Sequence, residues 1–410
     1  MEKIELLAPA GDMMRLKINL LYGADAIYFG GYKYGLRANA TNFSKEEIKE
    51  ASEFAHKLHK KVYLTLNIVF HNEDMNEVEE YIDEVVSAGI DAFIVSDPFI
   101  ISYIKEKHNN VEVHLSTQNS TTNYEAVNFF KSEGVDRIVL ARELSINEIK
   151  EIIDRTKIDI EVFIHGAMCT CFSGRCSLSN YITNRDANRG GCSQVCRFNF
   201  KTDSDDFTMA TKDLNLARYI KDLIDINVRS LKVEGRMRSI YYLATVIGTY
   251  RKIIDAIYGN YLTDEFLNEQ EKILSRVANR ETSTHYLVKE ADYNDQYYTG
   301  RNESSNQDYL GQVINYDKKN KLIKIYERNY FKIGDKVELF TPKGEVIPFV
   351  VEKLLDENKN DIDIARHPDD IYYIYLDTDR EIEEYSMIRL IGKGDVKNEN
   401  ESIWNTSVYI

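Results

Sequence analysis

All the thiols of this chain fall in one short segment: Cys169, Cys171, Cys176, Cys192 and Cys196. The rest of the 410 residues carries no cysteine, which excludes the distributed disulfide pairing of a small secreted fold. Thiolates this close in sequence repel one another unless a cation or a cluster takes up their charge. The segment therefore predicts a metal site.

The ligand set that we expect is Cys169, Cys176, Cys192 and Cys196, with the spacing C-x6-C-x15-C-x3-C. Zinc sites usually bring their ligands in tight pairs, and the first pair here is too widely spaced unless Cys171 takes part. A [4Fe–4S] cluster tolerates the wider spacing because each thiolate binds a different iron. We expect the cluster, with structural zinc as the alternative. Cysteines packed as small hydrophobic residues are a third interpretation, which suits Cys171 best.

The cysteine segment is basic, although the chain as a whole has a net charge of −15. An acidic protein repels nucleic acid on average, so any contact with RNA must be local. One interpretation is that the segment offers cations to an anionic partner such as RNA. The other is that they balance an anionic cluster or pair with acids elsewhere. The candidate RNA-binding residues are Arg185, Arg189, Arg197 and Lys201, and Arg175 adds a further charge.

Short apolar runs rich in Val, Ile and Tyr alternate with amphipathic helical stretches along the first part of the chain, as in βα units. Eight such strands close a barrel, so we expect an α/β fold of the TIM (β/α)8 type. The expected strands are 5–8, 26–29, 62–66, 92–95, 113–115, 137–140, 161–164 and 230–233, and two helices at 241–258 and 263–277 follow.

In such a barrel the chemistry takes place in the loops that follow the strands. Nearly every expected strand is followed by polar residues, which we interpret as one shared pocket, although Asp12 and Ser145 could simply cap the next helices. The cysteine-rich insertion, residues 166–201, follows the seventh strand and would form one wall of this pocket. The candidate catalytic residues are Arg37, Arg142, Glu143, His165, Arg175, Glu234 and Arg236.

Three regions are expected along the chain: a barrel with a helical extension at 1–291, a polar linker at 292–308 and a small all-β barrel domain at 309–410. The last region carries no catalytic motif, and a role in positioning or gating the substrate is our expectation for it. No run approaches the length of about eighteen apolar residues that a membrane span needs, and the chain opens on a strand-like run. We therefore expect a cytoplasmic protein with no membrane partner.

Several motifs resemble those of peptidase family U32, the collagenase-like proteases. They are Glu161-x-Phe-x-x-Gly-Ala-Met-Cys169-x6-Cys176-x-Leu-Ser, the opening Leu7-Ala-Pro-Ala-Gly-Asp12, and Leu231-Lys-Val-Glu-Gly-Arg236. The run Gly190-Gly-Cys-Ser-Gln-Val-Cys-Arg197 and the appended β domain look most like the branch of bacterial prephenate-dependent tRNA uridine hydroxylases. Other branches hydroxylate ribosomal RNA or ubiquinone.

This resemblance implies a [4Fe–4S] protein that contributes to 5-hydroxyuridine at the wobble position of tRNA, with prephenate as the hydroxyl donor and a paralogous partner or a second copy as an associate. Prephenate is a dicarboxylate, and guanidinium groups bind carboxylates bidentately. Glu143 or Glu234 would accept a proton or neutralise a neighbouring arginine, and Tyr28 or Phe172 would stack on a splayed uridine. The candidate carboxylate-binding residues are Arg37, Arg142, Arg175 and Arg236.

A peptidase is the alternative that the family name suggests. The sequence contains neither H-E-x-x-H nor G-x-S-x-G, and His165 with Cys169 and Ser173 is the one group that could resemble a protease site. Four cysteines bound to a cluster would leave Cys171 as the single free thiol. A third possibility is a metal-binding scaffold for an RNA-modification complex.

Overall fold

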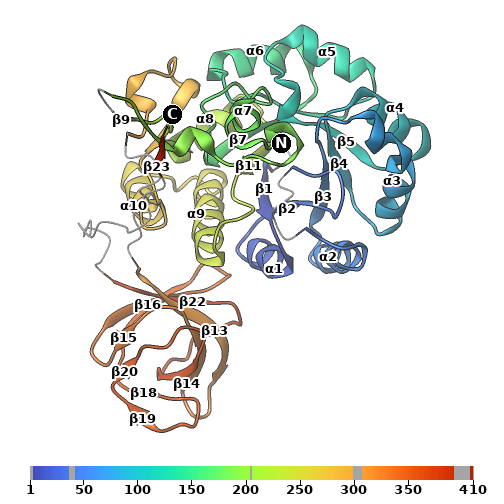
Figure 1. Cartoon of the computed structure of the whole chain (residues 1–410). Coiled ribbons are helices and arrows are strands. Elements are labelled where there is room, and N and C mark those ends of the chain that lie inside the picture. The colour runs from blue at the N-terminus through green and yellow to red at the C-terminus, as the bar shows by residue number, and fades with distance from the viewer. Residues whose placement is uncertain (1–2, 37–41, 204–205, 299–306, 392–406, 410) are drawn as a thin grey trace.

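A closed barrel of eight parallel strands forms the larger part of the computed structural model, which describes residues 3–36, 42–203, 206–298, 307–391 and 407–409 (Figure 1). The hydrogen-bonded order is β11-β1-β2-β3-β4-β5-β6-β7, and β11 also pairs with β7, which closes the ring. The strands are β1 (Glu5–Ala10), β2 (Ala26–Gly30), β3 (Lys61–Leu66), β4 (Ala92–Val95), β5 (Glu112–Leu115), β6 (Arg137–Val139), β7 (Asp159–Gly166) and β11 (Ser230–Val233). The predicted TIM-type barrel is confirmed.

Helices alternate with these strands and surround the barrel. The Asp12 side chain accepts a hydrogen bond from the backbone N–H of Arg15, and that of Ser145 accepts one from the N–H of Glu148, so both residues cap helices. The helices are α1 (Met13–Leu21), α2 (Lys45–Lys57), α3 (Val78–Ser87), α4 (Pro98–Lys107), α5 (Tyr124–Ser132), α6 (Ile146–Thr156), α8 (Ile220–Asp225), α9 (Ile240–Tyr258) and α10 (Asp264–Ser275). The two expected helices after the last barrel strand are present as α9 and α10.

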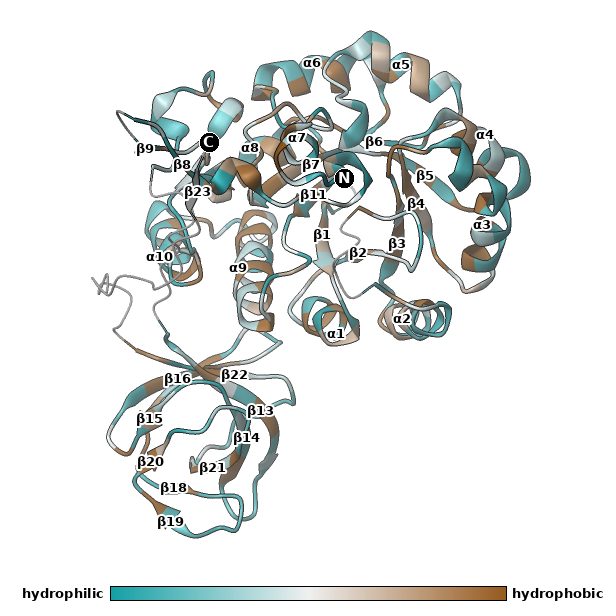
Figure 2. Cartoon of the chain, viewed as in Figure 1, coloured by the Kyte–Doolittle hydropathy of each residue, from teal (hydrophilic) through white to brown (hydrophobic). Residues whose placement is uncertain are grey.

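The core lies between the strands and the surrounding helices. In α6, for example, Ile149, Ile152 and Ile153 are buried, which is the spacing of one helix face. Figure 2 shows the same pattern as brown strands inside a ring of helices that carry teal on their outer surfaces. Burial of these apolar faces holds the barrel in the shape that positions its loops.

The cysteine segment lies between β7 and the last barrel strand, as predicted. It contains short elements only: α7 (Leu178–Thr183), the 3-10 turns η3 (Ala187–Arg189) and η4 (Val195–Arg197), and the paired strands β8 (Asn199–Lys201) and β9 (Asp206–Phe207). Strand β10 (Asp213–Asn215) then runs antiparallel to the end of β7 and pairs with β12 (Thr282–Ser283). The C-terminal strand β23 (Ser407–Tyr409) returns to pair with β8.

The C-terminal part is an antiparallel β domain (Figure 1), so the expectation of an all-β region is confirmed. Its strand order is β17-β16-β22-β13-β14-β21-β18-β19, and β15 pairs with β20 beside this sheet. The strands are β13 (Tyr309–Asp317), β14 (Leu322–Glu327), β15 (Phe331–Lys332), β16 (Lys336–Phe340), β17 (Val346–Val350), β18 (Leu354–Leu355), β19 (Asp361–Ile362), β20 (Ile364–Ala365), β21 (Ile371–Tyr375) and β22 (Met387–Leu390).

Part of the expected linker packs against the barrel. The turn η7 (Tyr293–Asp295) accepts a hydrogen bond at the Asp295 carbonyl from the backbone N–H of Lys212, and Asp295 is buried. Residues 299–306 of the linker lie outside the described residues, and the domain boundaries stay predictions. None of the helices in the described ranges combines the length and the apolar character needed to cross a membrane.

Candidate functional site: the barrel mouth

The cysteine segment is tied down by the loop that follows β6. The backbone N–H and Oγ of Ser173 both donate to the Glu143 carboxylate, at 2.9 and 3.1 Å, and Arg142 donates from Nη1 to the Ala167 carbonyl at 2.6 Å. Glu143 therefore anchors the segment and does not line the cavity described below. The structure thus places Glu143, one of the two expected proton acceptors, at an anchoring contact outside the cavity lining.

A glycine allows the segment to lie directly on the loop after β5. Gly174 has a φ of +74°, and a Cβ added there would lie 2.3 Å from the backbone oxygen of Gln118. A side chain at this position would meet rigid backbone as well as an unfavourable φ. The two backbones can approach this closely only because residue 174 is glycine.

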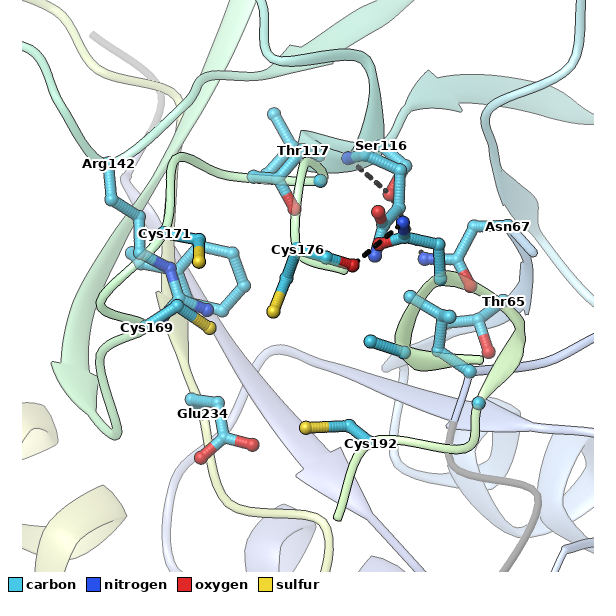
Figure 3. Close-up of a pocket in the computed structure, with 18 of the residues that line it drawn as sticks. Thr65, Asn67, Ser116, Thr117, Arg142, Cys169, Cys171, Cys176, Cys192 and Glu234 are labelled. Carbon is cyan, nitrogen blue, oxygen red and sulfur yellow. Dashed lines mark hydrogen bonds between the residues drawn. The ribbon is translucent and has the colours of Figure 1, made fainter. Parts of the chain in front are cut away.

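A cavity of about 220 Å³ opens between the carboxyl ends of the barrel strands and the cysteine segment. All five cysteines line it, and Figure 3 shows the thiols of Cys169, Cys171, Cys176 and Cys192 facing one space together with the Glu234 carboxylate. Cys171, expected to pack as a small apolar residue, is instead part of this group. The predicted wall of the pocket is thus where the sequence placed it.

The thiols influence one another electrostatically. Burial raises the pKa of Cys171 to about 12, with further contributions from Cys176 and Cys169, and burial raises the pKa of Cys196 to about 11. Without a cation these thiols stay protonated at neutral pH, whereas a bound metal stabilises the thiolate. No three His, Cys, Asp or Glu side chains in the described ranges are arranged as the ligands of a single ion. A [4Fe–4S] cluster does not need its ligands around a single ion, because each thiolate binds a different iron.

Three cations line the same cavity: Arg142, Arg236 and Lys232. The Arg142 guanidinium stacks over the Phe163 ring at 4.0 Å, and Arg236 is 5% exposed and donates to the Leu36 carbonyl. Both arginines were expected here from their places after β6 and β11. Their guanidinium groups can receive carboxylates in a setting largely shielded from water.

Lys232 was not among the residues that the sequence singled out. Its Nζ lies 2.7 Å from the Glu161 carboxylate and 4.4 Å from the centre of the Tyr28 ring. Arg137 also pairs with Glu161 and with Glu5, so a chain of buried charges fills the barrel beneath the cavity. Alternation along β11 could have indicated Lys232, because residues two apart on a strand share a face and Glu234 lines the cavity.

His165 is not placed for catalysis. It is 4% exposed, its Nδ1 lies 3.1 Å from the hydroxyl of Tyr250, and it does not line the cavity. Burial, together with the positive charge of Arg238, lowers the pKa of His165 to about 3, so the ring is neutral at physiological pH. Ser173 is bound to Glu143, and the protease-like group of His165, Cys169 and Ser173 is absent from the described structure.

Two of the predicted RNA-binding arginines are engaged inside the protein. Arg189 pairs with Asp74 at 2.6 Å and donates to the Val69 carbonyl, which joins η3 to the loop after β3. Arg197 is 8% exposed and donates to Gln194. The structure does not support a phosphate-binding role for Arg197, because burial keeps its guanidinium from a large polyanion.

The remaining basic candidates differ in their exposure. Arg175 and Arg185 are exposed and Lys201 is half-buried. Arg175 donates from Nε to the Ser120 hydroxyl and does not line the cavity, so it is not placed to bind a small carboxylate there. Arg37 lies outside the described residues.

The two aromatic candidates occupy different depths. Tyr28 is 7% exposed at the barrel interior and donates its hydroxyl to the Val233 carbonyl at 3.0 Å. Phe172 is 65% exposed and also lines the cavity. Phe172 therefore stands at the rim, where a ring can stack on a base, whereas Tyr28 belongs to the cavity floor.

The sequence was compared with known families and proteins. The family model "Peptidase family U32" matches residues 11–297, and "Peptidase family U32 C-terminal domain" matches residues 305–389. The chain is 45% identical to "tRNA hydroxylation protein P1" of Bacillus subtilis over 92% of both chains. It is 31% identical to "tRNA hydroxylation protein P" of Escherichia coli over 93% of this chain and 95% of that one. It is also 32% identical to "Collagenase" of Porphyromonas gingivalis, over 85% and 89% of the two chains.

Proposed function

This chain belongs to peptidase family U32, and from that premise we propose that it is an RNA-modifying enzyme that hydroxylates carbon 5 of the wobble uridine of tRNA. In this proposal it holds a [4Fe–4S] cluster and uses prephenate as the hydroxyl donor. The observation that carries the proposal is the gathering of five cysteines and three cations around one cavity. The names of the relatives from Bacillus subtilis and Escherichia coli support RNA as the substrate class.

Cys169, Cys176, Cys192 and Cys196 are the residues that would hold the cluster. They fit such a group because their thiols line one cavity, and burial raises the pKa of the Cys196 thiol, which a bound metal would offset. When bound, an iron–sulfur cluster supplies redox or Lewis-acid chemistry beside the substrates. Cys171 is the spare thiol in this assignment.

The cations of the cavity would bind the dicarboxylate. Arg142 and Arg236 approach from the loops after two different strands, and Lys232 lies deeper, above the buried Glu161. Two cations suffice for two carboxylates, and binding both carboxylates in the barrel mouth fixes the orientation of the small substrate. Glu234 lines the same cavity and is our candidate proton acceptor.

The tRNA would meet the exposed rim of the cavity. A uridine in a single-stranded loop can leave its stack, enter a pocket and rest against an aromatic ring, and Phe172 is the ring at this rim. Arg175, Arg185 and Lys201 are the basic residues of the cysteine segment that remain to contact phosphates.

The chemistry of the cavity does not favour the peptidase. A serine or cysteine protease needs a base within hydrogen-bond reach of its nucleophile, and the histidine nearest in sequence to the cysteines is turned to Tyr250. The name of the Porphyromonas gingivalis relative is therefore not extended to this chain.

The decisive experiment is mass spectrometry of tRNA nucleosides from a strain that lacks the gene. We expect 5-hydroxyuridine and its derivatives to disappear, to return with the wild-type gene, and to stay absent with Arg236→Met although the protein retains its iron. Arg155→Met is the matched control, because Arg155 is exposed on α6, pairs with Glu151 and does not line the cavity. Unchanged nucleosides in the deletion strain, together with peptide cleavage by the purified protein, would refute the proposal.

A further inference from the structure

A second cavity, of about 120 Å³, lies where α9 and α10 meet the β domain. We call it the junction cavity. Its walls include Lys252 and Thr245 of α9, Gln270 of α10 and Gly344 of the hairpin between β16 and β17. It shares no lining residue with the cavity at the barrel mouth, so it is a separate site.

Lys252 brings a positive charge into this cavity, and the one acid in the described lining, Asp255, pairs with Lys3 and Arg251. Burial lowers the pKa of Lys252 and the charge of Arg389 lowers it further, whereas the more distant Glu269 and Glu338 raise it. The Cε of Lys252 lies 3.4 Å from the position of a Cβ added to Gly344. Among the described residues no acid lies within ion-pair distance of Lys252, whereas the other three cations of the wall have acidic partners. These pairs are Arg251 with Asp25, Lys343 with Glu383, and Arg389 with Glu338.

Buried polar atoms in the same wall also lack partners. Thr245 and Gln270 are each 3% exposed, and the Thr245 hydroxyl, the Gln270 side-chain oxygen and Arg251 Nη2 have no hydrogen bond within the described structure. Buried polar atoms are rarely left in this state. Water alone could satisfy the hydroxyl and the amide, but it would not neutralise the ammonium of Lys252.

We propose that the junction cavity binds an oxyanion group of the phosphate class. Lys252 supplies the charge, and Arg251 Nη2 and the Thr245 hydroxyl supply hydrogen bonds. The group can come from a small phosphate-bearing molecule or from the backbone of an RNA. Since the walls come from both the barrel and the β domain, the bound anion stabilises their junction. This site does not depend on the proposed hydroxylase activity.

Calorimetric titration of the full-length protein with inorganic phosphate tests the proposal. Lys252→Met keeps the length of the side chain and removes its charge, and we expect it to weaken phosphate binding about tenfold or more. Thr245→Val removes only the hydroxyl and should weaken binding about threefold. Lys272→Met is the matched control, because Lys272 is an exposed lysine of α10 that does not line the cavity.

The thermal unfolding midpoint, measured without phosphate, shows whether a variant binds less phosphate only because it is less stable. It should not fall in Lys252→Met, because the variant removes a half-buried charge for which the described residues supply no ion pair. If phosphate does not saturate the wild type, the affinity for tRNA is measured at several salt concentrations. A slope of affinity against salt that is smaller in Lys252→Met by about one phosphate contact would assign the anion to an RNA backbone. Equal phosphate and tRNA binding by the wild type and Lys252→Met would overturn the proposal.

Discussion

A thiolate binds a cluster only through its own sulfur, so the five cysteines can be tested one at a time. Anaerobically purified protein should contain about four irons and four sulfides per chain. Alanine at position 169, 176, 192 or 196 should abolish the brown colour, whereas Cys171→Ala should retain iron although this thiol lines the same cavity. Iron and acid-labile sulfide assays measure this. One zinc per chain without sulfide would contradict the cluster.

The cations of the cavity predict a second measurement. Arg142→Ala should leave a carboxylate of prephenate unpaired in a partly buried site, at a cost of about 3 kcal/mol, or more than about a hundredfold in affinity. Because Arg142 also binds the Ala167 carbonyl, iron content must be measured on the same sample. Arg175→Ala should bind prephenate like the wild type. Equal affinities for all three proteins would place the dicarboxylate elsewhere.

The buried imidazole of His165 predicts a pH dependence of stability. Its pKa is about 3 in the folded protein against an ordinary value of 6.5, because burial and then Arg238 disfavour the charged ring. Its stabilising contribution is complete above pH 6.5. As the pH falls towards 3, the unfolded chain binds a proton that the folded protein does not, and the contribution is lost by up to about 1.4 kcal/mol per pH unit.

His165→Asn should remove this dependence and flatten the fall of unfolding free energy with pH, as measured by denaturant titration between pH 4 and 7. His59→Asn, at an exposed residue in the turn after α2, should leave the slope unchanged. An unaltered slope in His165→Asn would show that the ring is not buried in the neutral form. Retained tRNA hydroxylation in the same variant would agree with a structural role.

At the scale of elements, one backbone contact holds the cysteine segment on the loop after β5. Gly174→Ala would place a Cβ 2.3 Å from the Gln118 carbonyl, so we expect the segment to shift, iron content to fall and the barrel to keep its circular dichroism. Gly334→Ala is the control, because Gly334 also has a positive φ but has no atom within 4 Å of the added Cβ. Full iron content in Gly174→Ala would show that the segment tolerates the displacement.

At the scale of the whole molecule, Arg276 joins the barrel's helical extension to the β domain. It donates to Asp308 at 2.7 Å, to Glu338 at 2.8 Å and to the Leu390 carbonyl. Tyr241 and Tyr309 stack across the same junction with ring centres 4.6 Å apart. The two parts should therefore unfold together.

Arg276→Ala should separate their unfolding, since it removes the guanidinium that pairs with the buried Asp308 carboxylate, at a cost of about 3 kcal/mol. Differential scanning calorimetry would then show two transitions in place of one. Arg218→Ala, which removes a surface pair with Glu271, should keep the single transition. One cooperative transition in Arg276→Ala would mean that the stacked tyrosines are enough to couple the unfolding of the two parts.

The sequence alone determined the barrel, the place of the cysteine segment and the β domain. Strand and helix periodicity is local, and burial of the resulting apolar faces leaves few ways to arrange alternating strands and helices. The thiols were recognisable for the same reason, because their residue type and close spacing already define the chemistry. Asp12 and Ser145 show that helix-capping residues can also be predicted from the neighbouring sequence.

Only the tertiary structure decided which charged side chains face the cavity. Arg189 lies in the predicted basic segment, but its partner is Asp74, 115 residues earlier, and Lys232 finds Glu161 71 residues away. His165 lies four residues before the first cysteine and yet is turned to Tyr250 behind the barrel wall. Local spacing sets where a residue stands along an element. Its partner depends on contacts between distant parts of the chain, which form only when the barrel closes.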